Sequence, residues 1–162
     1  MHVVGPGNQK FVKLNSHSVC FGAKGNDYGQ FKAAKGGKLR KIKLVHLKGY
    51  VACTGPAPVY WSHWGCGLYS NSGSTNFIIV ALTNEGDKIL FPPSKLGKGS
   101  FNWVLVPGYN SYSPELVMSI YDRPVSISAG QNLRLWYIED LDDTWEADNH
   151  GRVCADVYGE FV

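Results

Sequence analysis

Short segments in which apolar and polar residues alternate recur along the whole chain, and they constrain its fold more than any other feature. In residues 39–51, Ile42 and Leu44 fall on one side and Lys41 and Lys43 on the other. A period of two is typical of a strand with one buried face. No stretch keeps a helical period over about 11 residues with helix caps. The chain is therefore expected to be all-β.

Turn residues separate these segments at intervals that suit antiparallel pairing. Strands are expected over residues 10–14, 39–51, 76–83, 88–91, 101–106, 115–121, 124–128, 133–137 and 152–158. Residues 84–87 are expected to form a hairpin turn, and the Gly- and Lys-rich residues 22–38 a long loop. Seven to nine short strands of this kind predict an antiparallel, jelly-roll-like β-sandwich.

The length of the chain, 162 residues, predicts one domain over residues 1–162. No apolar run reaches the length of about 18 residues that a membrane-spanning helix needs. The chain begins Met-His-Val-Val-Gly-Pro-Gly, which lacks the basic and apolar regions of a signal peptide. Such a start fits either a cytosolic protein or a mature secreted form with an added Met. We favour the secreted, extracellular form.

Four cysteines are present, and no two have the Cys-x-x-Cys spacing of a redox motif or zinc ribbon. Cys53 and Cys66 bracket a Pro-rich aromatic loop that a disulfide between them would close. Four free buried thiols are the alternative. Cys20 lies in a Gly-rich segment and is our candidate for a disulfide between two chains of a homodimer.

Charge is unevenly distributed, although the net charge is only +3. Residues 1–48 contain ten Lys or Arg and one acid, Asp27. This asymmetry can indicate a polyanionic partner, and the basic strand 40–43 is a candidate for sulphated glycans, although a solvated strand face gives the same pattern. A nucleic-acid partner is not expected, because the pI is about 8.6 and no recognition motif is present.

Residues 139–148 hold six of the 13 carboxylates of the chain. Carboxylates this dense raise each other's pKa and destabilise the fold unless a cation lies among them, and Ca²⁺ prefers oxygen ligands. The spacing is not that of an EF-hand, because Trp145 stands where the loop needs Gly and Gly151 where it needs Glu. An irregular Ca²⁺-binding loop on a β scaffold is therefore expected, and a solvated acidic loop is the alternative.

The end of the chain resembles the C-terminal signature of a family of secreted marine-invertebrate proteins that includes the Ca²⁺-dependent, galactose-specific lectin of sea anemones. The similar residues are Leu135-Trp136-Tyr137-x-Glu139-Asp140-Leu141-x-Asp143-x-x-Glu146-x-Asp148-Asn149-x-Gly151-x-x-Cys154-x-Asp156-Val157-Tyr158, together with Gly49-Tyr50-Val51-x-Cys53 and Trp64-Gly65-Cys66. The resemblance covers about two-thirds of the chain, from Gly49 onward. Ile138 and Trp145 depart from it, at positions often filled by Gly and by smaller polar residues.

The resemblance implies a β-sandwich lectin that holds a terminal galactose through Ca²⁺, as a disulfide-linked dimer. We assign the metal to Glu139, Asp140, Glu146, Asp148 and Asn149. We assign the sugar to Tyr137, Trp145, Glu146, Asp148 and Trp64, because the apolar face of galactose stacks on aromatic rings and its hydroxyls donate to carboxylates. Trp61, Trp103 and Trp136 are expected in the core.

Two other functions fit parts of the sequence. A glycoside hydrolase needs one protonated carboxyl group that is surrounded by apolar residues and separate from the other acids. The acids of this chain lie together in one short segment, so no enzyme activity is expected. An extracellular matrix or adhesion protein with a structural Ca²⁺ ion is the stronger alternative. It predicts that Ca²⁺ raises thermal stability while sugars have no effect.

Overall fold

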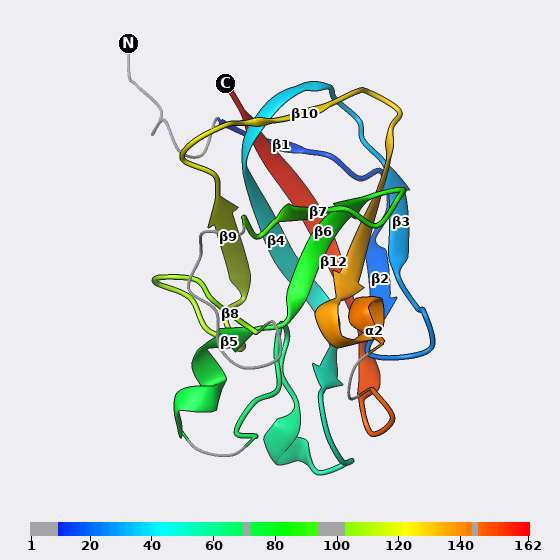
Figure 1. Cartoon of the computed structure of the whole chain (residues 1–162), viewed down its shortest axis with the longest axis vertical. Coiled ribbons are helices and arrows are strands. Elements are labelled where there is room, and N and C mark those ends of the chain that lie inside the picture. Colours follow the sequence, from blue (N-terminus) through cyan, green and yellow to red (C-terminus); the bar gives the residue numbers. More distant parts are fainter. Residues whose placement is uncertain (1–9, 70–71, 94–102, 144–145) are drawn as a thin grey trace.

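The computed structural model describes residues 10–69, 72–93, 103–143 and 146–162, and they form an antiparallel β-sandwich (Figure 1). The larger sheet runs β1 (Phe11–Lys13), β12 (His150–Phe161), β4 (Gly37–Ala52), β10 (Val125–Ile127), with β2 (Val19–Gly22) beside β12 and β9 (Glu115–Ser119) beside β4. The second sheet runs β3 (Gly29–Lys32), β11 (Asn132–Tyr137), β6 (Val80–Asn84), β7 (Ile89–Phe91). A small third sheet pairs β5 (Phe77–Ile78) with β8 (Val104–Leu105).

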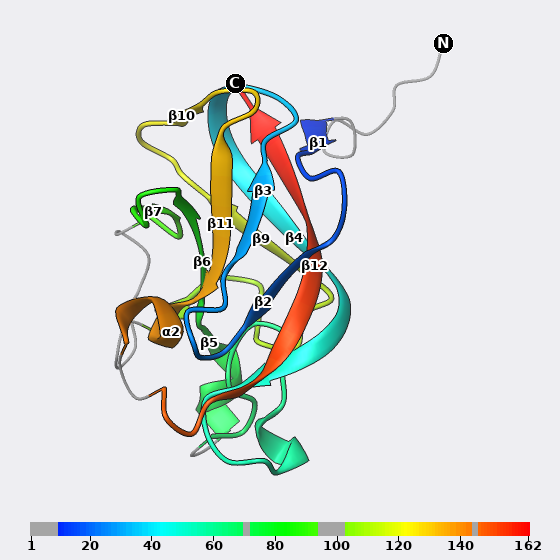
Figure 2. The ribbon, with the colours of Figure 1, turned by 90° about the vertical axis from the view of Figure 1, so that its right-hand side faces the viewer.

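The long pair β4 and β12 forms the centre of the larger sheet, and Figure 2 shows the two strands crossing the molecule together. Ile42 and Leu44 of β4 are fully buried, as are Val153 and Val157 of β12. They meet Leu135 and other residues of the second sheet in one core. The alternation of the sequence therefore becomes the buried face of a sandwich, as predicted.

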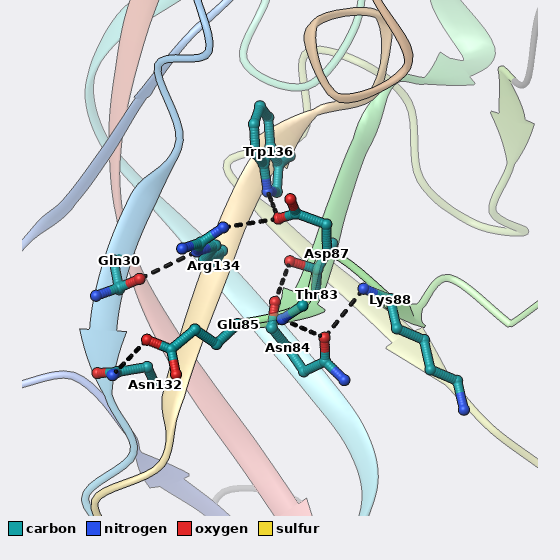
Figure 3. Close-up of polar contacts among 10 residues, drawn as sticks. Gln30, Thr83, Asn84, Glu85, Asp87, Lys88, Asn132, Arg134 and Trp136 are labelled. Atoms are coloured by element: carbon teal, nitrogen blue, oxygen red, sulfur yellow. Dashed lines mark hydrogen bonds and ion pairs between the residues drawn. The ribbon is translucent and has the colours of Figure 1, made fainter.

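The outer face of the second sheet carries a polar network around Arg134 (Figure 3). Its guanidinium donates to Gln30 on β3 and to Asp87 in the β6–β7 turn, each at 3.0 Å. Trp136 donates to the same Asp87 carboxylate at 3.1 Å. The ring of Tyr28 lies 4.0 Å below the guanidinium carbon. This network links β3 and β11 to the β6–β7 turn across the sheet surface.

Residues 22–38, predicted to be a loop, contain the strand β3 and the start of β4, and this prediction was wrong. Phe31 is buried between two exposed polar residues, so β3 does alternate, but it is only four residues long. The hairpin turn at residues 84–87 is confirmed by Asp87 N–H donating to the Asn84 carbonyl. The predicted strand 101–106 begins outside the described residues and continues in β8.

Both disulfides form within the chain. Cys53 bonds Cys66 and closes the aromatic loop, as predicted. Cys20 bonds Cys154, which lies directly opposite it where β2 pairs with β12. All four cysteines of the sequence are used. The prediction that Cys20 links two chains is therefore wrong. Among the helices within the described ranges, none is long and apolar enough to cross a membrane.

Candidate functional site

The acidic segment begins with a helical turn rather than an irregular loop. β11 ends at Tyr137 and α2 (Ile138–Asp142) follows it directly, so Glu139 and Asp140 are held on a single turn next to the sheet. Asp143 ends the helix with a left-handed backbone at φ 54°, a conformation that Asp adopts more readily than most residues. The first acids of the segment are thereby placed against the protein, while later ones turn back toward solvent.

Asp140 is a fully buried carboxylate. Its two oxygens accept the backbone N–H groups of Asn26 and Asp27, each at 2.8 Å. Both donors lie in the connection between β2 and β3, where Asn26 has a left-handed φ of 57°. Asp140 therefore fixes this connection against α2, a contact that is not visible in the sequence around either segment.

Asp140, Asp143 and Glu146 form a carboxylate cluster. One oxygen of each lies within 4.8 Å of one oxygen of the others. Burial raises the pKa of Glu146, and the nearby carboxylates of Asp140 and Asp143 raise it further, while the N–H of Gly25 opposes the shift. Three acids this close repel one another when ionised, and a cation among them would remove that repulsion.

The Glu139 side chain is not part of this carboxylate cluster and contacts Trp103 instead. Its Oε2 accepts the indole N–H of Trp103 at 2.8 Å, while its Oε1 is buried without a donor in the described part of the chain. Burial raises the pKa of Glu139 to about 7. The N–H of Trp103 and the amide of Asn149 partly oppose this shift, and the charge of Asp148 adds to it. When Glu139 is ionised, its Oε2 is therefore stabilised by Trp103 while its Oε1 has no donor within the described residues.

Asn149 is fully buried and its amide orientation is fixed. Its Nδ2 donates to the carbonyl of Ala23 at 3.0 Å, so its Oδ1 points away from that carbonyl. This Oδ1 has no donor, and neither has Oε2 of Glu146, within the ranges that the structure describes. Buried oxygens are rarely left without a partner. Carboxylate and amide oxygens without donors are ligands that suit Ca²⁺.

Asp148 connects the acidic segment to the aromatic loop. It is exposed and accepts the hydroxyl of Thr54 at 3.0 Å. Two residues further along the chain, the ring of His150 contacts the carbonyl oxygen of Gly55. The loop closed by the Cys53–Cys66 disulfide therefore lies beside the C-terminal end of the acidic segment.

Two aromatic residues predicted to stack on a sugar offer it no ring face. Trp64 and Tyr137 are both fully buried. The Trp64 indole donates to the Ser113 carbonyl at 2.7 Å, and the Tyr137 hydroxyl donates to the Gly65 carbonyl at 2.7 Å. Alternation along β11 places Tyr137 on the core side, so this part of the prediction is corrected. Trp145 lies outside the described residues.

Trp61, expected in the core, is instead the exposed aromatic residue beside the acidic segment. It is 36% exposed, and its ring stacks on Tyr50 with centroids 3.9 Å apart. Tyr50 in turn meets the edge of His150 at 5.7 Å. A bridge between Val51 and Ser62 holds the loop against the end of β4. Trp103 lies in the core, as expected, whereas Trp136 is buried outside the core, beside Asp87 on the outer face of the second sheet.

The structure thus brings the predicted metal residues into two neighbouring groups. Asp140 and Glu146 lie together with Asp143, which the assignment omitted although it stands in the same acidic run. Glu139 lies near Asp148 and Asn149. The supporting residues Asn26, Asp27 and Trp103 were missed because they come from distant parts of the chain, and nothing in their local sequence distinguishes them.

An antiparallel β-sandwich that carries such an oxygen-lined segment has the architecture of a lectin domain, among other extracellular modules. The chain is similar to AJLec from the sea anemone Anthopleura japonica, with 37% sequence identity and a TM-score of 0.82 over 94% of this chain and 97% of that chain. It belongs to the family of that lectin, as the C-terminal resemblance predicted. No protein-family model and no curated protein matches the chain.

Proposed function

We propose that the chain is a Ca²⁺-dependent lectin for terminal galactose. The observation that carries the proposal is the set of buried oxygens without donors on Glu139, Glu146 and Asn149. The family relation to AJLec supports a lectin role. Two disulfides within the chain are compatible with an extracellular protein.

The residues that would hold the ion are the predicted set together with one addition from the structure. They are Glu139, Asp140, Asp143, Glu146, Asp148 and Asn149. Bound Ca²⁺ would supply open coordination positions that vicinal sugar hydroxyls can fill, because it accepts six to eight oxygen ligands. Trp103 and the 26–27 backbone orient the carboxylates before any ligand arrives.

The acids that solvent reaches, Asp148 and in part Glu146, supply the polar contacts to the sugar. Asp148 is exposed and Glu146 is partly exposed, whereas Glu139 and Asp140 are buried, and a carboxylate accepts hydrogen bonds from hydroxyls more strongly than a neutral oxygen does. Trp61 replaces Trp64 and Tyr137 as the stacking ring for the apolar face of galactose. It is exposed, held by Tyr50, and next to the segment through Tyr50 and His150.

Retention on immobilised galactose tests the proposal. The protein is expected to bind in Ca²⁺ and to elute with EDTA, and Glu146→Gln is expected to elute earlier. Glu85→Gln is the matched control, because Glu85 is exposed in the β6–β7 turn, where it accepts from Asn132. Passage through the column in Ca²⁺ without retention would contradict the galactose assignment.

A matrix or adhesion protein with a structural Ca²⁺ ion is the second candidate. The full burial of Asp140 and Asn149 favours it, because ligands so deep hold an ion away from solvent. This function predicts that Ca²⁺ raises the melting temperature while no immobilised galactose retains the protein. The column and a thermal melt together separate the two functions.

A further inference from the structure

A pocket of about 260 Å³ opens on the outer face of the larger sheet, at β9. Its lining residues are Lys41, Val106, Pro107, Tyr109, Val117, Ser119 and Tyr121. Figure 1 shows β9 on the opposite side of β4, β6 and β12 from α2, so this pocket is separate from the acidic segment. Nothing in the galactose proposal uses it.

Strand alternation builds the floor of the pocket. β9 directs Leu116 and Met118 into the core, which leaves Val117 and Ser119 on the outer face. The register places Ser119 opposite Lys41 of β4. One wall is the turn at residues 106–109, which is closed by Tyr109 N–H donating to the Val106 carbonyl at 3.1 Å.

Lys41 brings to this pocket an ammonium that has no ion-pair partner among the described residues. Within the described part of the chain, no carboxylate oxygen lies within 4.0 Å of its ammonium. Glu160 stands opposite Lys41 on β12, which is the side away from β9. Lys43, two residues on, lies 3.9 Å from Glu115 and 4.8 Å from the centre of the Phe11 ring. Lys43 is engaged by the protein, whereas Lys41 faces the pocket.

The rest of the lining is aromatic and apolar. Tyr121 is 80% exposed, and it shares the pocket with Tyr109 and Pro107. A single exposed aromatic residue needs no explanation, but two tyrosines beside an unpaired ammonium form a surface with an apolar face and one cation. Sites for drug-sized ligands span about 300–1,000 Å³, so this pocket admits about one sugar ring.

We propose that this pocket binds a pyranose unit that carries one acidic group, a sulphate ester or a carboxylate, independently of Ca²⁺. The acidic group would accept hydrogen bonds from the Lys41 ammonium and the Ser119 hydroxyl. The apolar face of the ring would lie on Tyr121 or Tyr109. A neutral sugar would gain the stacking contact alone, so the acidic group determines selectivity.

Calorimetric titration in EDTA and low salt tests this proposal without the galactose site. Galactose 6-sulphate and glucuronic acid are titrated separately, with galactose and inorganic sulphate as the neutral and ring-free controls. We expect heat from at least one acidic sugar and at least tenfold weaker binding of both controls. The two acidic sugars distinguish a sulphate site from a carboxylate site.

Lys41→Gln is expected to weaken the acidic sugar at least tenfold. Lys43→Gln is the matched control, because it removes the same charge from the same face of β4 and is expected to change affinity less than twofold. Tyr121→Ala, an exposed position, reports on the ring contact and is expected to weaken binding several-fold. The proposal is overturned if neither acidic sugar binds the wild-type protein, if inorganic sulphate binds as well as the sugars, or if Lys41→Gln and Lys43→Gln behave alike.

Discussion

Glu139 and Asn149 are the residues on which the metal proposal depends, because each has a buried oxygen without a donor. The positions of both were predictable, since the acids and the amide lie within eleven consecutive residues. The contacts that the Glu139 and Asn149 side chains make could not be predicted from the sequence. Trp103 and Ala23 are far away in sequence, and only the folded chain brings the indole to Glu139 and the carbonyl to Asn149.

Asn149→Ala is expected to lower Ca²⁺ affinity by about tenfold or more, because it removes a ligand oxygen that is already oriented. It also removes a hydrogen bond to Ala23, which costs about 1 kcal/mol of stability. Calcium titration measures the first effect, and urea unfolding in EDTA measures the second. Asn132→Ala, which removes from β11 a partly exposed amide that donates to Glu85, is the control. Equal calcium affinity in the two variants would rule out Asn149 as a ligand.

The raised pKa of Glu139 predicts a pH effect in the absence of Ca²⁺. Its folded pKa of about 7 lies above the usual 4.5, so the folded state holds its proton more tightly than the unfolded state. This contribution to stability is fully present below pH 4.5 and is lost as the pH rises through 7. Glu139→Gln cannot ionise and should lose less stability between pH 5 and pH 8.

Urea unfolding in EDTA at the two pH values measures this difference. Other titrating groups, such as His63, are present in both proteins and cancel in the comparison. Glu115→Gln, at an exposed position of β9, should behave as the wild type. An identical pH dependence for the wild type and Glu139→Gln would mean that Glu139 titrates normally in the folded protein.

At the scale of elements, the length of a segment decided how well the sequence predicted it. β4 and β12 span 16 and 12 residues, so their alternation is unmistakable. β2 and β3 have four residues each, and α2 has five, which is too few for either periodicity to stand out. Four cysteines allow three pairings, and spacing favoured the local Cys53–Cys66 pair only.

The aromatic loop is the element that we expect to contact the sugar ring. Trp61→Ala should weaken galactose about tenfold, which corresponds to about 1.4 kcal/mol, and should leave Ca²⁺ affinity unchanged. Tyr112→Ala is the control, because Tyr112 is a 42% exposed aromatic residue on another turn. Calorimetry on both variants measures the effect. Unchanged galactose affinity in Trp61→Ala would place the stacking ring elsewhere, with Trp145 the next residue to test.

The two disulfides should differ in their effect on stability. In the chain-entropy description, the Cys20–Cys154 bond closes a far longer loop than Cys53–Cys66, with sequence separations of 134 and 13. Replacing each pair by Ser is expected to cost about 5 and about 3 kcal/mol, respectively. Urea unfolding measures both costs.

Non-reducing electrophoresis of the wild type should show a single-chain band, and a band at twice the mass would contradict the internal pairing.

At the scale of the whole molecule, the sandwich places chemically different surfaces on separate sides. The acidic segment follows the end of β11, and Trp61 is linked to its C-terminal end through Tyr50 and His150, while the Lys41 pocket lies at β9. The antiparallel sandwich was predictable because alternation is a local signal. The burial of Trp64 was not, because it depends on how the loop folds over the sheets. Tyr137 alternates in phase with Leu133 and Leu135, so its burial could have been predicted from the same signal.

Calcium should stabilise the whole fold, because it binds residues that order only in the native state. An ion at a hundred times its dissociation constant adds about 2.7 kcal/mol to the free energy of unfolding. The melting temperature should therefore rise with Ca²⁺ and fall with EDTA. If neither Ca²⁺ nor EDTA changes the melting temperature, the buried oxygens of Glu139 and Asn149 do not bind Ca²⁺.

Calorimetric titration of galactose and mannose, first in Ca²⁺ and then in EDTA, tests the central claim most directly. Heat from galactose that exceeds the heat from mannose, and that disappears in EDTA, is the predicted result. Galactose heat that persists unchanged in EDTA would contradict the role of Ca²⁺. An absence of heat from either sugar in Ca²⁺, with Ca²⁺ still raising the melting temperature, would contradict the lectin and identify the acidic segment as a structural metal site.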